Sequence, residues 1–329
     1  MTQGLFFPEE VSAMILAGKK LLLAGSEKLL SQLPKGDWIG GSTPLFILHA
    51  GQRSTSYDKI FVNQLPDFVT ETVIQEYDET NVQDIFMDSP ENGFTVLIVP
   101  YDTPVSIEYT LNATNYEKFA VKPVCGWVSG QPLEVLHKER AYTASGSGSG
   151  IYTDRAVAMH ISLPDTKYAE IHIYSPYKQG NGDTITFDSD EVVVKDAFIN
   201  GVKRNFAEYL REINHNMLIP IVADYCGALI CVVSCGITED EVQMSSPVFK
   251  SIEYRLAAID NNIVEPSMAD DRIVFSVTCV GFFGQPDICS KFMKKMNGPV
   301  VYGEIAYQVL GQTTVYVTID DVQINAGAI

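Results

Sequence analysis

Residues 37–44 read DWIGGSTP, and the fold around this stretch has to accommodate two adjacent glycines near the N-terminus. Gly40 and Gly41 follow a Trp-Ile pair and precede two hydroxyls, Ser42 and Thr43. Glycines allow neighbouring backbones to approach closely, and the N–H groups of a glycine turn can cradle an anion. The Walker lysine and its spacing are missing, which argues against a nucleotide loop. We predict a tight turn at a strand end, with these four residues bordering a ligand cleft.

The composition excludes several classes of partner. The chain has 329 residues, 46% of them hydrophobic, and 41 acidic against 23 basic side chains give a formal net charge of −18. Phosphate recognition needs clustered Lys and Arg, so this balance argues against nucleic acid and against an anionic membrane surface. Residues 218–237 approach the length of a membrane span. Pro220 and Asp224 interrupt them, however, and we predict two buried strands instead.

The cysteines indicate a reducing compartment. Six cysteines lie mostly in apolar runs, and no pair has the CxxC spacing of a zinc or redox site. We predict that all six are buried, reduced thiols. The N-terminal residues show no basic region before an apolar run, so we expect no signal peptide and a cytoplasmic protein.

Apolar patterns indicate a chain with both helices and strands. A proline and two acids begin a helix at Pro8, and LLLAG at 21–25 is typical of a buried strand. Ser26 is placed to cap a second short helix. Residues 201–213 have the amphipathic pattern of a helix, which we expect to connect two halves of the molecule. The Ser/Gly-rich residues 143–150 predict a mobile hairpin loop.

Two histidines are candidates for a metal or haem site. Residues 156–163 and 168–174 alternate between apolar and polar side chains, and LPDTK between them is typical of a turn. An antiparallel hairpin would place His160 beside or diagonal to His172 on the polar side. Paired imidazoles there could ligate a metal ion or haem iron. A solvent-exposed polar strand face explains both residues equally well.

Glu304 is a candidate binding residue because its neighbours predict burial. It follows Gly303 in an apparent strand that contains Val301, Ile305 and Val309. A buried carboxyl group requires hydrogen bonds or a cavity, and the Thr313 hydroxyl is a candidate partner. Exposure at a sheet edge is the alternative.

Several of these motifs together resemble the FIST family of sensory domains. DWIGGSTP is similar to its Gly-Cys-Ser/Thr-Thr turn, with Gly41 in place of the cysteine, and VKPVCGWVSG resembles its second Gly-rich turn. RIVFSVTCVGF resembles its Phe-Ser-Cys segment, with Cys279 displaced and the usual arginine absent. GPVVYGEIAYQVLGQTT resembles its closing Gly-Glu motif. The resemblance implies an N-terminal part over 1–205 and a C-terminal part over 206–329. We accordingly predict an α+β protein of two halves, with mixed, largely antiparallel sheets and helices packed outside in layers.

The resemblance implies a sensor that binds a small molecule and has no catalytic activity. Amino acids have been proposed as ligands of the family, and some members bind haem, so haem is a candidate cofactor here. We expect ligand contacts from Gly40, Gly41, Ser42 and Thr43, and from Glu304 and Thr313. The signal would pass to a separate protein.

Two alternatives from other functional classes remain open. A hydrolase or transferase could use Ser42 or Cys279 with Glu304, although the GxSxG elbow is absent and a serine nucleophile needs a positioned base. The protein could also be structural or self-assembling, with a vestigial cleft.

Overall fold

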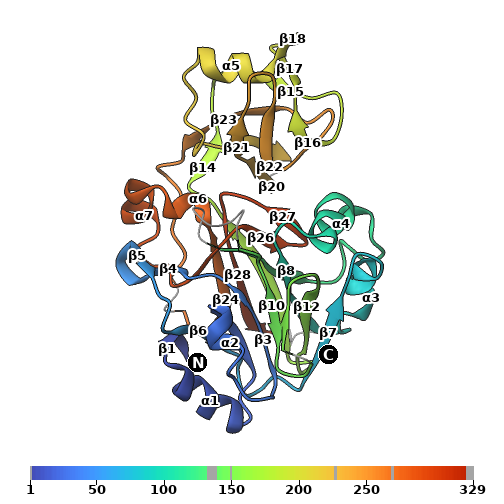
Figure 1. The fold of residues 1–329 in the computed structure, drawn as a ribbon, viewed down its shortest axis with the longest axis vertical. Helices are drawn as coiled ribbons and strands as arrows, with labels where there is room; N and C mark the ends of the chain where they lie inside the picture. The colour runs from blue at the N-terminus through green and yellow to red at the C-terminus, as the bar shows by residue number, and fades with distance from the viewer. Residues whose placement is uncertain (1, 132–138, 149, 226–227, 268–269, 324–329) are drawn as a thin grey trace, which may run out of the picture.

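The computed structural model describes residues 2–131, 139–148, 150–225, 228–267 and 270–323 (Figure 1). The mixed α+β class is confirmed, because 17% of the chain is helical and 44% is strand. A larger body contains three sheets, and a smaller lobe lies above it in Figure 1. The predicted division into two layered halves stays a prediction.

The first sheet of the body contains the N-terminal strands and the glycine pair. Its six described strands are, in order, β1 (Gln3–Phe6), β6 (Ile60–Gln64), β2 (Leu21–Gly25), β3 (Trp38–Ser42), β10 (Thr143–Ser145) and β11 (Ile151–Tyr152). The helices α1 (Pro8–Leu16) and α2 (Glu27–Leu30) begin where the sequence indicated. The strand predicted at residues 21–25 is also confirmed as β2. The turn predicted for Gly40 and Gly41 is wrong, because both lie inside β3 and pair with strands on both sides.

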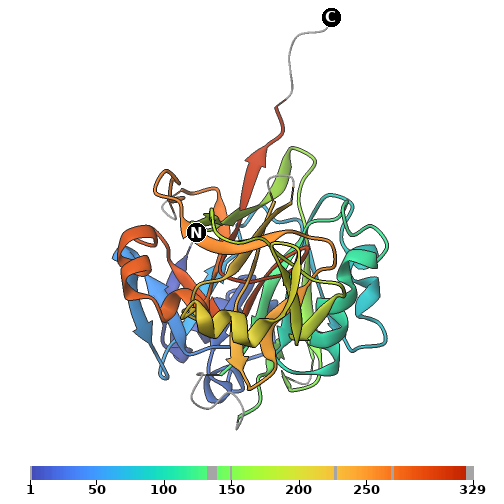
Figure 2. The ribbon, with the colours of Figure 1, turned by 90° about the horizontal axis from the view of Figure 1, so that it is seen from above.

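The second sheet joins central and C-terminal parts of the chain. Its strands are, in order, β27 (Gln308–Leu310), β26 (Gly303–Ala306), β9 (Val124–Ser129), β8 (Gly93–Pro100), β12 (Ala156–Ser162) and β7 (Glu71–Tyr77). The helices α3 (Ile85–Asp88) and α4 (Pro104–Asn112) lie on the flank of the body that is teal in Figure 2. Thr103 caps α4 by accepting a hydrogen bond from the Ser106 N–H.

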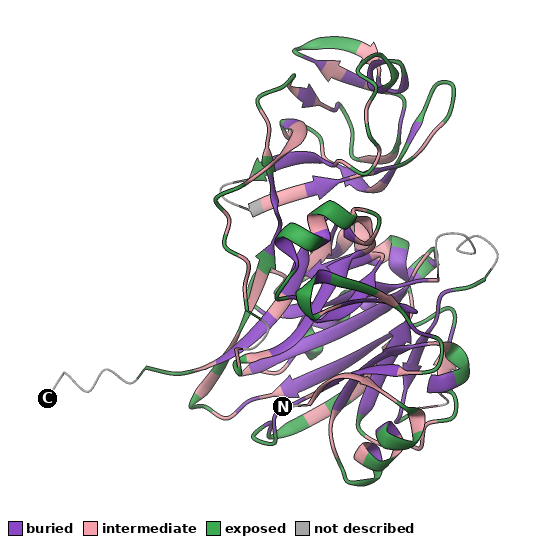
Figure 3. Ribbon diagram, turned by 90° about the vertical axis from the view of Figure 1, so that its left-hand side faces the viewer, coloured by how far each residue is buried: buried purple, intermediate pink, exposed green. Residues whose placement is uncertain are grey.

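The third sheet completes the body. Its strands are, in order, β13 (Lys167–Tyr174), β28 (Thr314–Asp321), β24 (Ile273–Cys279), β25 (Gly298–Val301), β4 (Leu45–Leu48) and β5 (Gln52–Thr55). The helices α6 (Val280–Phe283) and α7 (Pro286–Phe292) lie on the opposite flank from α3 and α4 (Figure 2). Apolar side chains of the second and third sheets share one buried cluster. Figure 3 shows the buried residues concentrated in the strands of the body.

The hairpin predicted to pair residues 156–163 with 168–174 is wrong. β12 pairs with β7 and β8 in the second sheet, whereas β13 pairs with β28 in the third. The predicted division of faces is correct for β12, because Val157, Met159 and Ile161 all enter the same core cluster. The partners of both strands come from distant parts of the chain.

The smaller lobe has two sheets, one of seven described strands and one of three, and an apolar core of its own. That core draws on residues 185–254. The strands of the lobe are β14 (Tyr177–Gln179), β15 (Ile185–Thr186), β16 (Glu191–Val194), β17 (Asp196–Ile199), β18 (Val202–Asn205), β19 (Ile221–Tyr225), β20 (Ala228–Val232), β21 (Ser234–Ile237), β22 (Val242–Val248) and β23 (Tyr254–Ile259). The segment 218–237, predicted to form two buried strands, instead contains the three strands β19, β20 and β21, and β21 is only partly buried. No helix in the described part of the chain is long and apolar enough to cross a membrane.

The helix predicted over 201–213 is shorter, because its first residues form a strand. Asn200 and Gly201 have φ values of 50° and 81° and connect β17 to β18 as a two-residue hairpin. Asn-Gly is the residue pair that such a turn favours. The helix α5 occupies only Phe206–Glu212, capped by the Asn205 side chain. The boundary predicted between residues 205 and 206 therefore falls between two adjoining elements of the lobe.

The five described cysteines are free, as predicted. Four of them are buried, whereas Cys235 is exposed, so the prediction of burial is wrong at that position. Cys226 lies outside the described residues.

Candidate functional site

Gly41 allows close packing between sheets, whereas Gly40 packs against Leu23 of the neighbouring strand β2 and Leu30 of α2. A Cβ atom built on Gly41 would lie 2.7 Å from Ile98 Cγ2, 3.0 Å from Trp127 Nε1 and 3.1 Å from Ser129 Cβ. Ile98, Trp127 and Ser129 belong to β8 and β9 of the second sheet. The backbone of β3 at Gly41 therefore lies directly against the second sheet. This close packing explains why residue 41 is a glycine, and no bound ligand is needed to explain it.

Gly41→Ala should destabilise the protein by about 1–3 kcal/mol, because the added methyl group overpacks a filled interior. Urea denaturation of the variant would measure this loss. Gly182→Ala is the matched control, since nothing lies within 4 Å of a Cβ atom at that position. Equal stability of the two variants would show that β3 can shift away from the second sheet at little cost.

Ser42 and Thr43 use their hydroxyl groups to join backbone segments. The Ser42 hydroxyl donates to the Tyr142 carbonyl at 3.3 Å and accepts from the Tyr142 N–H at 3.1 Å. The Thr43 hydroxyl donates to the Val300 carbonyl at 2.7 Å. Both side chains are buried. A serine nucleophile requires a basic side chain that hydrogen-bonds its hydroxyl group. Among the described residues, the Ser42 hydroxyl bonds to the backbone of Tyr142 and to no basic side chain.

Glu304 is fully buried, with 0% of its surface exposed, as its sequence context predicted. Its Oε1 accepts a hydrogen bond from the Thr313 N–H at 3.2 Å. Three nearby buried oxygens have no hydrogen-bond partner of normal geometry among the described residues: Glu304 Oε2, Gln312 Oε1 and Thr313 Oγ1. Burial raises the pKa of Glu304 to about 8, although its own backbone, Thr313 and the Cys279 thiol oppose the shift. The carboxyl group is therefore mostly neutral at pH 7.

Cys279 lies beside Glu304 but has the wrong electrostatics for a nucleophile. Burial raises the pKa of the Cys279 thiol well above its ordinary value, and the negative charge of Glu304 raises it further. The thiolate is the reactive form of cysteine. The Cys279 thiol beside Glu304 therefore stays protonated at neutral pH.

The structure brings three of the predicted binding residues, Gly41, Glu304 and Thr313, into one buried region. Trp127 lies opposite Glu304 in the β9–β26 pair, and its indole nitrogen is against Gly41. Thr313 contacts Glu304 through its backbone. Every one of these side chains is buried, so the region is packed rather than open.

His160 and His172 lie in different sheets, which corrects the predicted imidazole pair. His160 is buried, and its ring nitrogens are 2.9 Å from the Tyr77 hydroxyl and 2.9 Å from the Thr95 hydroxyl. His172 lies on the outer face of the third sheet, with Nε2 2.9 Å from the Thr318 hydroxyl. Across the described residues, no three His, Cys, Asp or Glu side chains form a group that could hold a metal ion.

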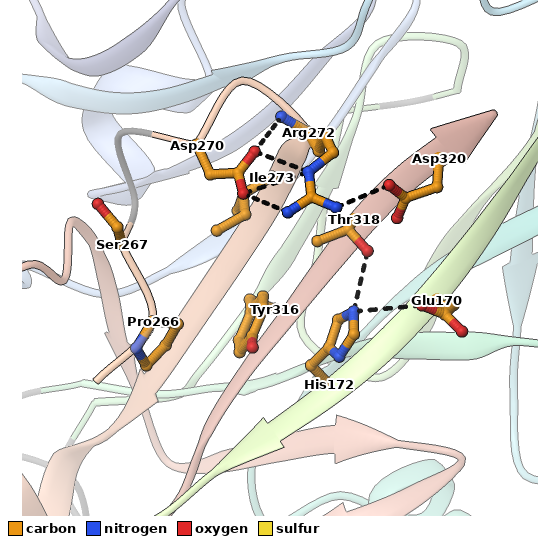
Figure 4. Close-up of a pocket in the computed structure, with 10 residues that line it drawn as sticks. All are labelled: Glu170, His172, Pro266, Ser267, Asp270, Arg272, Ile273, Tyr316, Thr318 and Asp320. Carbon is orange, nitrogen blue, oxygen red and sulfur yellow. Dashed lines mark hydrogen bonds and ion pairs between the residues drawn. The ribbon is translucent and has the colours of Figure 1, made fainter. Parts of the chain in front are cut away.

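An open pocket of about 250 Å³ lies around His172 (Figure 4). Three strands and the loop before β24 form it, and Glu170 and Thr318 face each other across the β13–β28 pair. The lining side chains are Glu170, His172, Pro266, Ser267, Asp270, Arg272, Ile273, Tyr316, Thr318 and Asp320. Strand alternation explains the polar lining, because the intervening residues Val315, Val317 and Ile319 enter the core.

Two rigid arrangements shape the interior of the pocket. The His172 and Tyr316 rings stack with centroids 4.8 Å apart and an interplanar angle of 15°. Arg272 donates through Nη2 to Asp270 at 2.6 Å and through Nη1 to Asp320 at 2.9 Å. Hydrogen bonds from Arg272 lower the pKa of Asp270. Asp270 and Asp320 bind the guanidinium from two directions.

Sequence reasoning identified His172 but missed the rest of the pocket. The alternation in TVYVTIDD at 314–321 does show that Tyr316, Thr318 and Asp320 share a face. The partner strand, however, lies about 150 residues earlier in the chain, and no local pattern indicates that pairing.

The fold and this pocket define a mixed α+β protein with an open polar site on a sheet face. The chain belongs to a family of unknown function (DUF6976), whose family model matches residues 6–320. No curated protein matches the chain. The match gives no link to the FIST family, so that resemblance stays a prediction.

Proposed function

We propose that this protein binds a small ligand reversibly in the pocket on β13, β28 and β24, and that it acts as a sensor without catalysis. The observation that carries the proposal is the pocket itself. It is a hollow of about 250 Å³, and side chains from distant segments of the chain converge in it. This volume is slightly below that of pockets for drug-sized molecules. A small metabolite therefore fits the site best.

The site chemistry favours binding over catalysis. The Arg272 guanidinium is held by two carboxylates, and the stacked rings of His172 and Tyr316 supply a wall rather than a nucleophile. The buried region gives little support to the enzyme alternative, in which Ser42 or Cys279 would act with Glu304. Its groups are neutral, packed and enclosed there.

The ligand contacts predicted for Gly40, Gly41, Ser42, Thr43, Glu304 and Thr313 remain a second proposal. Their support is the unpartnered oxygen of Glu304 and those of its neighbours. We further propose a cytoplasmic location and a separate protein that receives the signal. The layered two-half arrangement and the structural alternative rest on the sequence alone.

A blocked pocket tests the main proposal. Ser267 is exposed at the pocket, so Ser267→Trp should fill the hollow without disturbing the sheet. A thermal-shift screen of small metabolites should find compounds that raise the melting temperature of the wild type by several degrees. The Ser267→Trp variant should lose this response, and the compounds should be recovered chemically unchanged.

The matched control is Ser290→Trp, an exposed serine on α7 that does not line the pocket. This variant should keep the wild-type response. Identical responses of the two tryptophan variants would show that the ligand binds outside this pocket. Conversion of the compound into a product would show that the protein is an enzyme and would contradict the proposed sensor.

A further inference from the structure

The charges that line the pocket define what it can accept. Its lining contains the carboxylates of Glu170, Asp270 and Asp320 against the single guanidinium of Arg272, which gives a formal charge of −2. The whole chain has a formal net charge of −18, so the field outside does not offset this excess. An anionic ligand would meet repulsion both on approach and inside the pocket.

Arg272 is the group that could otherwise attract an anion, but three of its five N–H donors already bind carboxylates. Nε donates to Asp270 at 3.0 Å, in addition to the bonds that Nη1 and Nη2 make with Asp320 and Asp270. The Arg272 carbonyl also accepts a hydrogen bond from the Ile319 N–H at 2.9 Å, which fixes the loop to β28. An anion would have to bind the two remaining N–H groups of Arg272 directly beside the carboxylates of Asp270 and Asp320.

Glu170 is the carboxylate left for a ligand. No Lys or Arg in the described part of the chain forms an ion pair with it, and its Oε2 lies 3.9 Å from His172 Nε2. Its side chain is 54% exposed, so a ligand can reach it directly. A ligand ammonium group there would form a charge-assisted hydrogen bond.

Tyr316 supplies an apolar surface beside these charges. Figure 4 shows its ring between His172 on one side and Pro266 on the other, below the Arg272 guanidinium. Ile273 adds an aliphatic group to the same wall. A ligand with a short hydrocarbon portion can lie along this wall while a charged end reaches Glu170.

We propose that the ligand is a small organic cation, an amine or diamine with a short aliphatic chain, held by Glu170 and by the Tyr316 wall. This inference rests on the proposed binding function and names its ligand class. Glu170 determines the charge preference of the site, and the ion-paired Asp270, Arg272 and Asp320 form its rigid border.

Three probes with the same five-carbon chain separate charge from shape. Pentane-1,5-diamine is a dication at neutral pH, 5-aminopentanoate is a zwitterion, and glutarate is a dianion. Isothermal titration calorimetry on the full chain should give the tightest binding for the diamine, weaker binding for the zwitterion and none for glutarate. Glu170→Gln should weaken diamine binding about tenfold, the loss expected for one charge-assisted contact.

The matched control is Glu79→Gln, which removes one exposed carboxylate from a turn outside the pocket. This variant should bind the diamine like the wild type, whereas an equal loss in both variants would show general attraction to an acidic protein and overturn the proposal. Tighter binding of glutarate would overturn it in favour of Arg272 as the anchor. If none of the probes binds, but Ser267→Trp still abolishes a response found in the metabolite screen, the ligand class is wrong and the binding function stands.

Discussion

Glu304→Gln should make the protein more stable than the wild type at alkaline pH, by up to about 5 kcal/mol above pH 9. The pKa of Glu304 is about 8 in the folded protein against an ordinary 4.5. A raised pKa means that the folded state holds its proton more tightly than the unfolded state. The stability that this proton contributes is therefore complete below pH 4.5 and is lost as the pH rises through 8. Glutamine is never ionised, and its amide can still accept from the Thr313 N–H and donate to an unpartnered oxygen nearby.

Urea denaturation of both proteins between pH 4.5 and pH 9.5 measures this effect. The difference in the free energy of unfolding, variant minus wild type, should be close to zero at pH 4.5 and should increase up to pH 9. Glu79→Gln, at an exposed turn, should show a difference within about 0.5 kcal/mol at every pH. A Glu304→Gln variant that is less stable than the wild type at pH 9 would mean that an ionised carboxylate has an essential partner there.

His160 should produce the opposite slope at acid pH. Burial lowers the pKa of His160 to about 4 from an ordinary 6.5, although the negative charge of Asp88 opposes the shift. The unfolded chain therefore takes up this proton first, and about 3 kcal/mol of stability should be lost as the pH falls from 6.5 to 4. Both ring nitrogens are in use in the neutral form. The Tyr77 hydroxyl donates to Asp88, which leaves its oxygen to accept from Nε2, and Thr95 can donate to Nδ1.

The His160→Gln variant isolates this contribution from that of the carboxylates, which also titrate below pH 5. The difference in the free energy of unfolding, wild type minus variant, should decrease by about 3 kcal/mol between pH 7 and pH 4. A direct check is the NMR titration of the His160 ring, which should remain neutral at pH 5. A ring that is protonated at pH 6 would contradict the inference.

The elements that could be predicted from the sequence are those that local patterns specify. Leu21–Gly25 is an apolar run between polar residues, and it forms a buried strand. Pro8 begins a helix because its fixed φ suits the first turn. The Asn200-Gly201 turn is an equally local signal, but the amphipathic pattern across residues 201–213 indicates a helix where the four-residue strand β18 forms.

Strand pairing could not be predicted in the same way. The alternation in residues 167–174 shows which side chains share a face but not which strand lies beside them. The nearest strand in sequence was the natural candidate for a partner, and it lies in another sheet. Glu304 could be found because its own neighbours indicate burial, whereas the pocket depends on Tyr316 and Arg272 meeting His172 across that unpredicted pairing.

The position of β28 between β13 and β24 also has a consequence for synthesis of the protein. A chain that emerges from the ribosome presents residues 167–174 long before residues 314–321 exist to pair with them. Until then, the edge of β13 stays open to chaperones or to neighbouring nascent chains. Because β28 also carries Tyr316, Thr318 and Asp320, the pocket exists only after this strand has been translated and has paired with β13 and β24. A product truncated before residue 314 would therefore lack the pocket.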